Sequence, residues 1–281
     1  MFYFISLFCT LLCCLQVSNQ AKIPIHTYDS LVSYLTNGSR VSYFFNTTTC
    51  KPISSTAAAA ADLPIFGGEI NFFLASKSSE SAAVQLIFNH EVVEFDTKGA
   101  LKVDLYSMYI MEDTLRMMYG KPGFFANNTD KIKGVICKWP IGNGNFWAHK
   151  PAFPKHLSSY NDIRQTVVGG DLIRFVITTG GCKCPSGEDC GDDYVGGDMK
   201  DFKITKEGTI SFSKYMTLYF PISTSPMYYR VVFVGNVQPN NTLTFLLSYV
   251  DATTWKIEYD VTMACQIGNT PGHADFYFSS D

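Results

Sequence analysis

The chain has 281 residues, and apolar and aromatic side chains make up 46% and 15% of it, which excludes a largely disordered protein and suffices for about two domain cores. Lys and Arg number 22 against 25 Asp and Glu, a net charge of −3. Because no basic run interrupts this balance, the sequence excludes the cationic surface that a nucleic-acid partner requires.

The first 20 residues form a short apolar segment that ends in small and polar residues, the layout of a secretory signal peptide. Its apolar core ends near Val17, short of the about 20 residues that a membrane span needs. No later segment is apolar over that length. We therefore predict a cleaved signal peptide at residues 1–20 and a secreted, extracellular protein without a membrane span.

A short helix followed by a strand is predicted directly after the signal. Apolar side chains recur at three- and four-residue spacing in residues 28–35, Thr27 suits the N-cap, and Gly38 suits the left-handed residue that ends a helix. Residues 40–45 are rich in β-branched and aromatic side chains, which favours a strand that leads to Cys50.

The same signals recur once, from Tyr160 to Cys182. This segment and Tyr28–Cys50 both run 22 residues from tyrosine to cysteine (50 − 28 and 182 − 160), so an offset of 132 aligns them without a gap. In the second copy, Ser159 is the expected cap and residues 172–178 the expected strand. We infer a duplicated unit.

The duplication extends beyond the opening segment. Gly67-Gly68 aligns with Gly196-Gly197 at an offset of 129, and Cys137 with Cys265 at an offset of 128. We divide the chain into a signal peptide (1–20), unit 1 (21–137), a connector (138–159), unit 2 (160–265) and a C-terminal tail (266–281). The connector holds three prolines and four large aromatic residues, so we expect part of it to pack between the units.

The second part of each unit has the pattern of β-strands. Apolar and polar residues alternate from Ile257 to Cys265, which is typical of a half-buried strand. Turn residues separate neighbouring runs. We expect an α+β protein of two homologous units, each a short helix followed by an antiparallel β meander of roughly five or six strands.

Six cysteines remain once Cys9, Cys13 and Cys14 leave with the signal, as expected of disulfides in an oxidising compartment. They allow fifteen pairings. Because a bond in one copy should have a counterpart in the other, the duplication predicts Cys50–Cys137 and Cys182–Cys265, and leaves Cys184–Cys190. A zinc site on Cys182, Cys184 and Cys190 lacks a fourth ligand nearby, so we predict no metal and no cofactor.

Four sequons are further signs of export, and each is a candidate glycan acceptor: Asn37, Asn46, Asn127 and Asn240. An acidic loop offers carboxylates that could surround calcium, although it lacks the D-x-D-x-D-G order and we interpret it as a solvated loop. Its residues are Glu188, Asp189, Asp192, Asp193 and Asp198.

Motifs of nucleophilic catalysis or metalloproteases are absent from the sequence: it has no G-x-S-x-G and no H-E-x-x-H, and its five histidines do not recur between the copies. A sugar-binding platform of stacked aromatics is an alternative to ordinary core packing for five residues. These are Tyr106, Tyr109, Trp147, Tyr228 and Tyr229.

The second unit resembles the VirK family. The resemblance rests on its opening segment at Tyr160–Cys182 and on GGDMKDF (196–202), ISFSKYMTL (210–218), YYRVVF (228–233), YVDATTWK (249–256) and VTMAC (261–265). Unit 1 matches in its opening and its cysteines but has LIFN at residues 86–89 in place of ISFS. The resemblance implies small exported proteins, extracellular where the domain is duplicated in animals, and no established catalytic residues.

We therefore expect a secreted, disulfide-bonded glycoprotein, not an enzyme, with a binding or extracellular-matrix role toward an extracellular protein or glycan. Two alternatives remain open: a secreted host-interaction or defence effector, and a secreted hydrolase. A Ser–His pair or two convergent acids in a cleft would favour the hydrolase.

Overall fold

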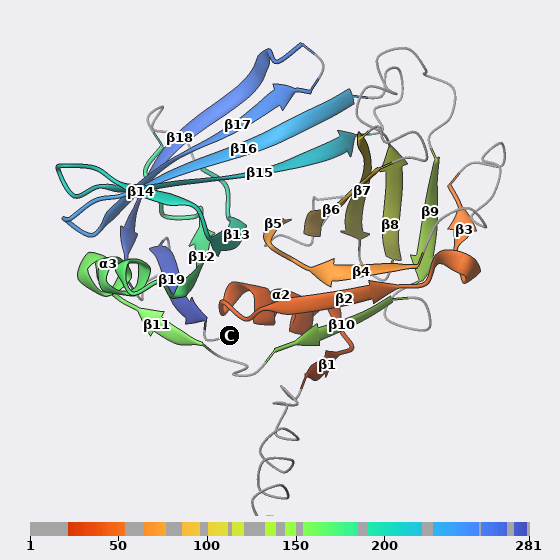
Figure 1. The fold of residues 1–281 in the computed structure, drawn as a ribbon, viewed down its shortest axis with the longest axis horizontal. Helices are drawn as coiled ribbons and strands as arrows, with labels where there is room; N and C mark the ends of the chain where they lie inside the picture. Colours follow the sequence, from red (N-terminus) through yellow and green to blue (C-terminus); the bar gives the residue numbers. More distant parts are fainter. Residues whose placement is uncertain are drawn as a thin grey trace, which may run out of the picture.

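The computed structural model describes residues 22–53, 65–76, 86–95, 101–111, 114–120, 133–138, 144–149, 154–184, 190–220, 227–252, 254–268 and 273–279. These residues form mostly antiparallel β-structure with two short α-helices (Figure 1). The predicted signal peptide and the predicted glycan acceptor Asn127 lie outside the described residues. No helix in the described part is long and apolar enough to cross a membrane.

The elements of the N-terminal half are β1 (Ile23–Ile25), α2 (Tyr28–Thr36), β2 (Val41–Phe45), the 3-10 turn η1 (Thr47–Thr49), β3 (Lys51–Pro52), β4 (Phe66–Glu69), β5 (Phe72–Ser76), β6 (Leu86–Phe95), β7 (Leu101–Met111), β8 (Thr114–Gly120), β9 (Lys133–Lys138) and β10 (Gly144–Ala148). Those of the C-terminal half are β11 (Lys155–Leu157), α3 (Tyr160–Val168), β12 (Leu172–Thr178), β13 (Asp193–Met199), β14 (Phe202–Ile204), β15 (Ile210–Phe220), β16 (Met227–Val237), β17 (Thr242–Asp251), β18 (Ile257–Ile267) and β19 (His273–Ser279).

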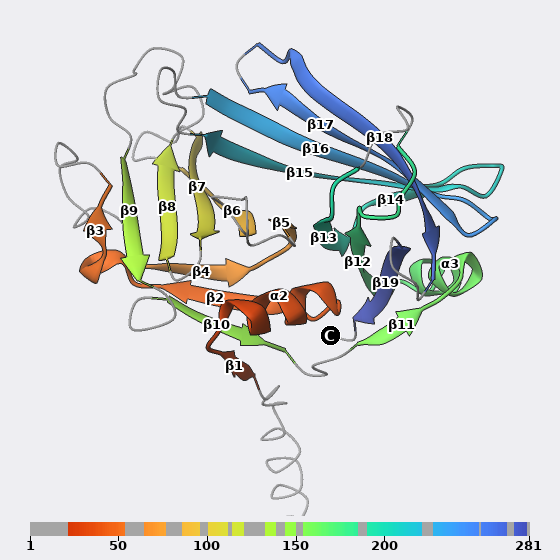
Figure 2. The ribbon, with the colours of Figure 1, turned by 180° about the vertical axis from the view of Figure 1, so that it is seen from behind.

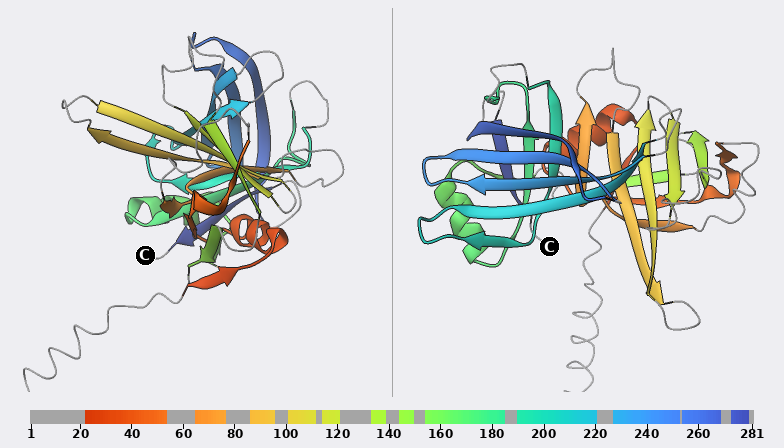
Figure 3. Two further views of the ribbon diagram at one scale, coloured as in Figure 1. Left: turned by 90° about the vertical axis from the view of Figure 1, so that its right-hand side faces the viewer. Right: turned by 90° about the horizontal axis from the view of Figure 1, so that it is seen from above.

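The strands form two sheets. The small sheet has the order β1-β10-β2-β4, and the large sheet has the order β14-β15-β16-β17-β18-β19-β12-β13-β5-β6-β7-β8-β9-β3, with β11 paired to β19. The large sheet therefore runs through both halves, joined where β13 pairs with β5. Figure 2 shows α3 beside β11 and β19, and Figure 3 shows the β6–β7 hairpin reaching past its neighbours.

Both predicted helices are confirmed. The side chains of Thr27 and Ser159 accept hydrogen bonds at the two N-caps, from the backbone N–H groups of Ser30 and Asp162. The chain then turns through Gly38 and Gly170, which have φ angles of +75° and +83°. A Cβ atom at Gly38 would lie 2.3 Å from the ring of Tyr277, so glycine also lets α2 approach the C-terminal half.

Residues that the sequence offsets align have matching strand pairings in the two halves. Tyr43 lies opposite Gly68 in the β2–β4 pair, and Phe175 lies opposite Gly197 in the β12–β13 pair, which correspond at offsets of 132 (175 − 43) and 129 (197 − 68). The pairs Leu115↔Cys137 and Leu243↔Cys265 correspond at 128, and Lys51↔Ile136 matches the bridge Lys183↔Ala264.

The pairing of β13 with β5 at the junction of the halves explains why residues 196 and 197 are both glycine. Gly196 and Gly197 on β13 lie opposite Phe73 and Phe72 on β5. A Cβ atom would lie 2.5 Å from the Phe73 ring at Gly196 and 2.6 Å from the Asn71 carbonyl oxygen at Gly197. Because successive side chains of a strand point to opposite faces, Phe73 packs in the core of the N-terminal half and Phe72 in that of the C-terminal half.

Two segments outside the predicted units supply strands. Residues 138–159 contain β10, which pairs with β1 and β2, and β11, which pairs with β19. Residues 266–281 contain β19, which lies between β18 and β12. Each half is therefore larger than the predicted unit, and β19 interrupts a simple meander because it pairs in parallel with β18.

Strand β18 is only partly buried. The predicted alternation is present at its end, where Met263 and Cys265 are buried. At its start, however, Ile257 and Tyr259 are 56% and 58% exposed. Apolar side chains of this strand therefore continue beyond the core and reach the surface of the sheet.

Candidate functional site

A cleft of about 500 Å³ lies at the junction of the two halves. This volume is typical of ligand-binding pockets. Most of the side chains around it are polar, and they come from both halves: Tyr43, Gly68, Glu69, Asn71, Phe72, Asn89, His90 and Glu91, and Asp201, Ser213, Lys214 and Tyr215. We refer to these residues as the junction cleft.

The sheet opens at this position because β5 and β6 diverge. Among the described residues, β5 pairs with β6 only at Leu74 and Ala75, although β6 continues to Phe95. On the other side, β14 pairs with β15 only at residues 210–212 of β15. Among the described residues, the start of β5 therefore has a ladder only with β13, and residues 213–220 of β15 have one only with β16. The two unpaired sides border an opening in the sheet, which ends where Ser107 of β7 contacts Thr217 of β15.

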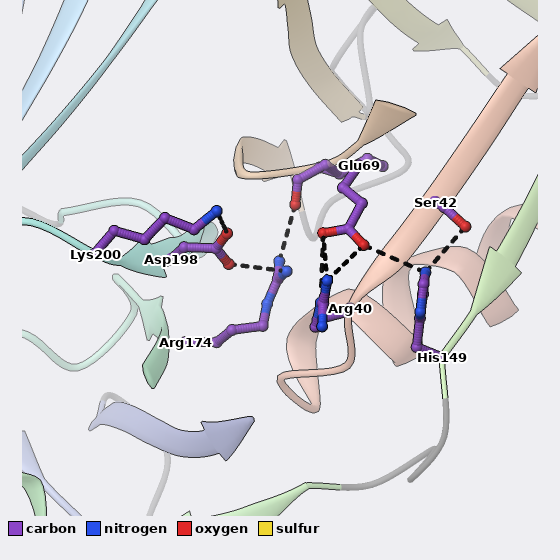
Figure 4. A network of polar contacts seen from close by, with 8 residues as sticks. Arg40, Ser42, Glu69, His149, Arg174, Asp198 and Lys200 are labelled. Carbon is purple, nitrogen blue, oxygen red and sulfur yellow. Dashed lines mark hydrogen bonds and ion pairs between the residues drawn. The ribbon is translucent and has the colours of Figure 1, made fainter. Parts of the chain in front are cut away.

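A buried ion pair lies beside the junction cleft (Figure 4). Arg174 on β12 is fully buried, and its Nη1 atom lies 3.0 Å from Oδ1 of the buried Asp198 on β13. Its Nη2 atom donates a hydrogen bond of 3.1 Å to the Ile70 carbonyl oxygen of the N-terminal half. Lys200 lies 3.5 Å from the other Asp198 oxygen. The pair therefore ties β12 and β13 to the segment before β5.

Glu69, which lines the junction cleft, is the centre of a second set of polar contacts. Its carboxylate accepts a 2.8 Å hydrogen bond from Arg40 and lies 3.5 Å from Nε2 of His149. The same Nε2 atom lies 3.1 Å from the Ser42 hydroxyl (Figure 4). Ser42, His149 and Glu69 are thus in contact. In a catalytic triad, however, the nucleophile contacts one ring nitrogen of the histidine and the acid contacts the other. Both of these contacts use Nε2, and Ser42 is buried.

Burial controls the protonation of the polar side chains in the junction cleft. It lowers the pKa of the Lys214 ammonium, an effect that the Asp198 carboxylate opposes. It also lowers the pKa of His90 and raises the pKa of Tyr43, whose hydroxyl lies 2.8 Å from Nδ1 of that imidazole. At neutral pH His90 and Tyr43 are therefore uncharged hydrogen-bonding groups.

Acidification through the range just below the ordinary histidine pKa of 6.5 is expected to destabilise the protein. Burial lowers the pKa of both His90 and His149 in the folded state, so the unfolded chain binds protons first. The stability that these neutral groups contribute is complete above 6.5 and is lost as the pH falls toward their folded pKa. The midpoint of urea unfolding, measured at about pH 7.5 and about pH 5.5, should fall.

The control for this effect is His90→Gln, which keeps a polar side chain but does not titrate. Its urea midpoint should fall less between the two pH values than that of the wild type. An equal or larger fall would contradict the assignment to His90. Burial raises the pKa of Asp275 because it favours the protonated carboxyl. Protonation of Asp275 therefore stabilises the folded state as the pH falls, which opposes the histidine effect but occurs at a more acidic pH.

A second cavity of about 340 Å³ lies farther along the sheet, between β5 and β13 on one side and β17 and β18 on the other. Its lining is more apolar and includes Leu74, Val195, Leu247 and Met263. Cys190, which is bonded to Cys184, also lines this cavity. The junction cleft has the richer set of hydrogen-bonding groups, so we take it as the candidate site.

The structure joins the cysteines in three disulfides. Cys50 is bonded to Cys137 over a separation of 87 residues, Cys182 to Cys265 over 83, and Cys184 to Cys190 over 6. These are the pairs that the duplication predicts. The two long-range bonds connect the segment after β2 and after β12 to the strands β9 and β18.

Three of the four predicted glycan acceptors are described. Asn37 at the C-terminus of α2 and Asn240 in the turn before β17 are exposed. Asn46 is half-buried, and its side-chain oxygen accepts hydrogen bonds from the N–H and hydroxyl of Thr48. The Asn37 amide also donates to the Ser33 carbonyl, and the Asn240 side-chain oxygen accepts from the Thr242 N–H. Asn37 and Asn240 are therefore distinguished from Asn46 by their greater exposure alone.

The acidic loop does not form one site in the described residues. Asp192 and Asp193 are exposed, whereas Asp198 is buried in the ion pair with Arg174. Glu188 and Asp189 lie outside the described residues. Among the residues that the structure describes, no group of three or more His, Cys, Asp or Glu side chains could hold a metal ion.

Ordinary core packing, and not the alternative of an aromatic platform, holds for Tyr106 and Tyr109, which are 3% and 2% exposed because β7 lies between two other strands over a core. The side chain of Tyr228 is not among those that the structure describes, and Trp147 is half-buried. Tyr229 packs edge-on against Tyr249, with ring centroids 6.4 Å apart.

Exposed aromatic residues gather instead around Arg230. The guanidinium carbon of Arg230 lies 5.2 Å from the ring centroid of Tyr215 and 4.6 Å from that of Trp255. Trp255 is 62% exposed and has a φ angle of +61°, in the left-handed region that non-glycine residues rarely adopt. Tyr215 also lines the junction cleft, so this aromatic strip continues from its rim.

Comparison with known proteins places a family match in the C-terminal half. Residues 156–255 match the model of the family described as VirK protein. No curated protein matches the chain. Among solved structures, the chain is similar to a VirK family protein from Legionella pneumophila, with 14% sequence identity over 43% of this chain and 98% of that chain and a TM-score of 0.36.

Proposed function

We propose that this chain, whose residues 156–255 form a VirK domain, is a secreted glycoprotein of two homologous VirK-like units that binds an extracellular ligand without catalysis. The observation that carries the binding role is the junction cleft of about 500 Å³, in which both halves present hydrogen-bonding side chains.

The equivalence of the strand pairings supports the duplication. Chance similarity of a short sequence segment would not extend to the hydrogen-bonded register of strands far apart in the chain. Here β2–β4 matches β12–β13 and β8–β9 matches β17–β18, at the offsets that align the sequence. Both halves also carry a disulfide at the same place in this arrangement.

Export is supported by the disulfides. Bonds that persist between cysteines are typical of proteins in oxidising compartments and rare in the cytosol. The apolar N-terminal segment and the four sequons are consistent with the same route.

Glycosylation is expected when the chain is expressed through a eukaryotic secretory pathway. The exposed amides of Asn37 and Asn240 should carry glycans. Intact-mass measurement before and after enzymatic deglycosylation should show a loss of mass, and Asn37→Gln and Asn240→Gln should each remove one glycan. Secreted protein that has the mass of the unmodified chain would contradict this prediction.

A binding role explains the cleft better than hydrolysis does. The Ser42–His149–Glu69 contacts lie beside the cleft, but their geometry does not match a triad and Ser42 is buried away from a substrate. The cleft itself combines neutral His90 and Tyr43 with the amides of Asn71 and Asn89. Such groups orient a ligand through hydrogen bonds without reacting with it.

Filling the junction cleft is expected to abolish binding. Asn71→Trp places an indole in the cleft from an exposed side chain, whereas Arg164→Trp adds the same group on the exposed surface of α3. Both variants and the wild type should be tested on a glycan array and with a random peptide display library. We expect the wild type and Arg164→Trp to select ligands and Asn71→Trp to lose them.

Three results would contradict the proposal. The first is that the wild type selects no ligand from either source, and the second is that Asn71→Trp binds the same ligands as the wild type. The third is hydrolytic activity in a broad substrate screen that Ser42→Ala abolishes, because a nucleophile would then act at this site.

A further inference from the structure

Strand β15 has an open edge beside the junction cleft at residues 213–216, between its ladder with β14 and the contact of Thr217 with Ser107 on β7. It pairs with β16 along its whole length, from Ile210 to Phe220. On its other side, among the described residues, the only ladder is with β14 at residues 210–212. An open strand edge presents backbone N–H and C=O groups that can pair with a further strand.

The backbone groups of Ser213 and Tyr215 point toward this opening. The Thr217 carbonyl oxygen accepts a 3.4 Å hydrogen bond from the Ser107 hydroxyl on β7, across the open side of β15. In an antiparallel strand, the N–H and C=O of one residue point to the same side and those of the next residue point to the other. Because the register of β15 is regular, Ser213 and Tyr215 share the direction of Thr217.

The composition of the cleft wall agrees with this orientation. Side chains of consecutive residues in a strand point to opposite faces, so a pocket on a face would contact every second residue. The cleft instead contacts three consecutive residues of β15 (213–215), and three of β6 (89–91) on the opposite wall. A run of neighbours on both walls means that the cleft lies between strand edges.

The charge around the opening favours a cationic ligand. Three carboxylates line the cleft, of which Glu69 is bound to Arg40 and the other two, Glu91 and Asp201, are exposed. Lys214 is a single cation on the β15 wall and is half-buried. The exposed Lys200 is bound to Asp198 beside the cleft, and Arg230 packs on Tyr215, so neither is part of the lining. The exposed charge among the lining side chains is therefore negative, and lysine or arginine side chains of a ligand would complement it.

We propose that the ligand of the junction cleft is an extended, positively charged peptide segment of a partner protein, which pairs with the open edge of β15 as an added strand. This inference rests on the proposed function, because it names the occupant of the same cleft. Backbone hydrogen bonds from Ser213 and Tyr215 hold the segment, and Glu91 and Asp201 select its basic side chains.

The test uses the full mature protein and a display library of random octapeptides. Selection on the wild type is expected to enrich peptides rich in Lys and Arg. Ser213→Pro removes the N–H that faces the cleft at a position where an edge strand tolerates proline, and Ser213→Ala keeps it. Selected peptides should bind Ser213→Pro about tenfold more weakly or worse, and Ser213→Ala as well as the wild type.

Two further measurements keep the test independent of folding effects. The double variant Glu91→Gln with Asp201→Asn changes only exposed side chains. It should weaken the binding of the basic peptides and remove their enrichment in the selection. N-methylation of alternate residues of a selected peptide keeps its charge but blocks backbone pairing, and it should abolish binding to the wild type.

Peptides that bind equally well with a methylated backbone, or equally well to Ser213→Pro, would overturn the added strand. Glycans selected by the wild type and lost in Asn71→Trp, without any peptide selected, would overturn the peptide ligand while leaving the proposed binding function in place. Failure of both libraries would overturn both.

Discussion

Replacing Arg174 by Met is expected to destabilise the protein by about 3 to 5 kcal/mol, the usual cost of removing one partner of a buried ion pair. Arg174 is fully buried, and its loss leaves the buried carboxylate of Asp198 with only the exposed Lys200, 3.5 Å from its other oxygen. The same variant removes the hydrogen bond to the Ile70 carbonyl, which joins the two halves. Domains typically have about 5 to 15 kcal/mol of stability, so this loss would be a large fraction of the total.

The measurement is the urea midpoint of unfolding, with Arg164→Met on the exposed surface of α3 as the matched control. The control should be close to the wild type. The double variant Arg174→Met with Asp198→Leu should recover part of the loss, because it removes both charges together. A single variant as stable as the wild type would show that the pair does not hold the junction.

Removing the Cys182–Cys265 disulfide is expected to cost about twice as much stability as removing Cys184–Cys190. The first bond closes 83 residues and the second closes 6. In the chain-entropy model, loops of these lengths contribute about 4.5 and about 2 kcal/mol. The difference arises in the unfolded chain, where the longer loop loses more conformational freedom when it is closed.

The comparison uses paired replacements, Cys182→Ser with Cys265→Ser and Cys184→Ser with Cys190→Ser, so that neither variant keeps a lone thiol. Urea unfolding of the oxidised proteins gives both values. Cys50→Ser with Cys137→Ser, which opens 87 residues, should resemble the first pair. If the short bond proved the more stabilising of the two, unfolded-state entropy would not be the main effect.

Local structure was predictable where local signals decide it. The caps Thr27 and Ser159 and the glycines that follow each helix act within a few residues, so both helices and the strands after them occur where the sequence places them. The disulfide pairs are long-range, but the duplication supplies a long-range constraint. It limits the pairings without any knowledge of the fold.

The strands β10, β11 and β19 were not predicted because they lie in the segments interpreted as a connector and a C-terminal tail. Their burial depends on partners far along the chain: β10 pairs with β1 and β2, and β19 pairs with β12. No local pattern records such a partner. The apolar side chains in these segments, such as Phe146 after Asn145 and Phe276 after Asp275, become buried only within the sheet.

The junction cleft could not be predicted from the sequence for the same reason. Residues 89–91 and 213–215 are distant in sequence and face each other because β13 pairs with β5. One signal was present: residues 86–88 correspond to 210–212 at an offset of 124 (210 − 86), and the residues that follow each segment form the two walls of the cleft. Likewise, Arg174 within the apolar run of β12 calls for a buried anion, which proves to be Asp198.

Hydrogen–deuterium exchange of the wild-type protein, alone and with the strongest ligand from either library, tests most directly whether the junction cleft is the binding site. Binding there should slow exchange in the segments around Asn71, residues 89–91 and residues 213–215, and leave the aromatic strip near Trp255 unchanged. Protection confined to other segments, or none in these three, would contradict the account.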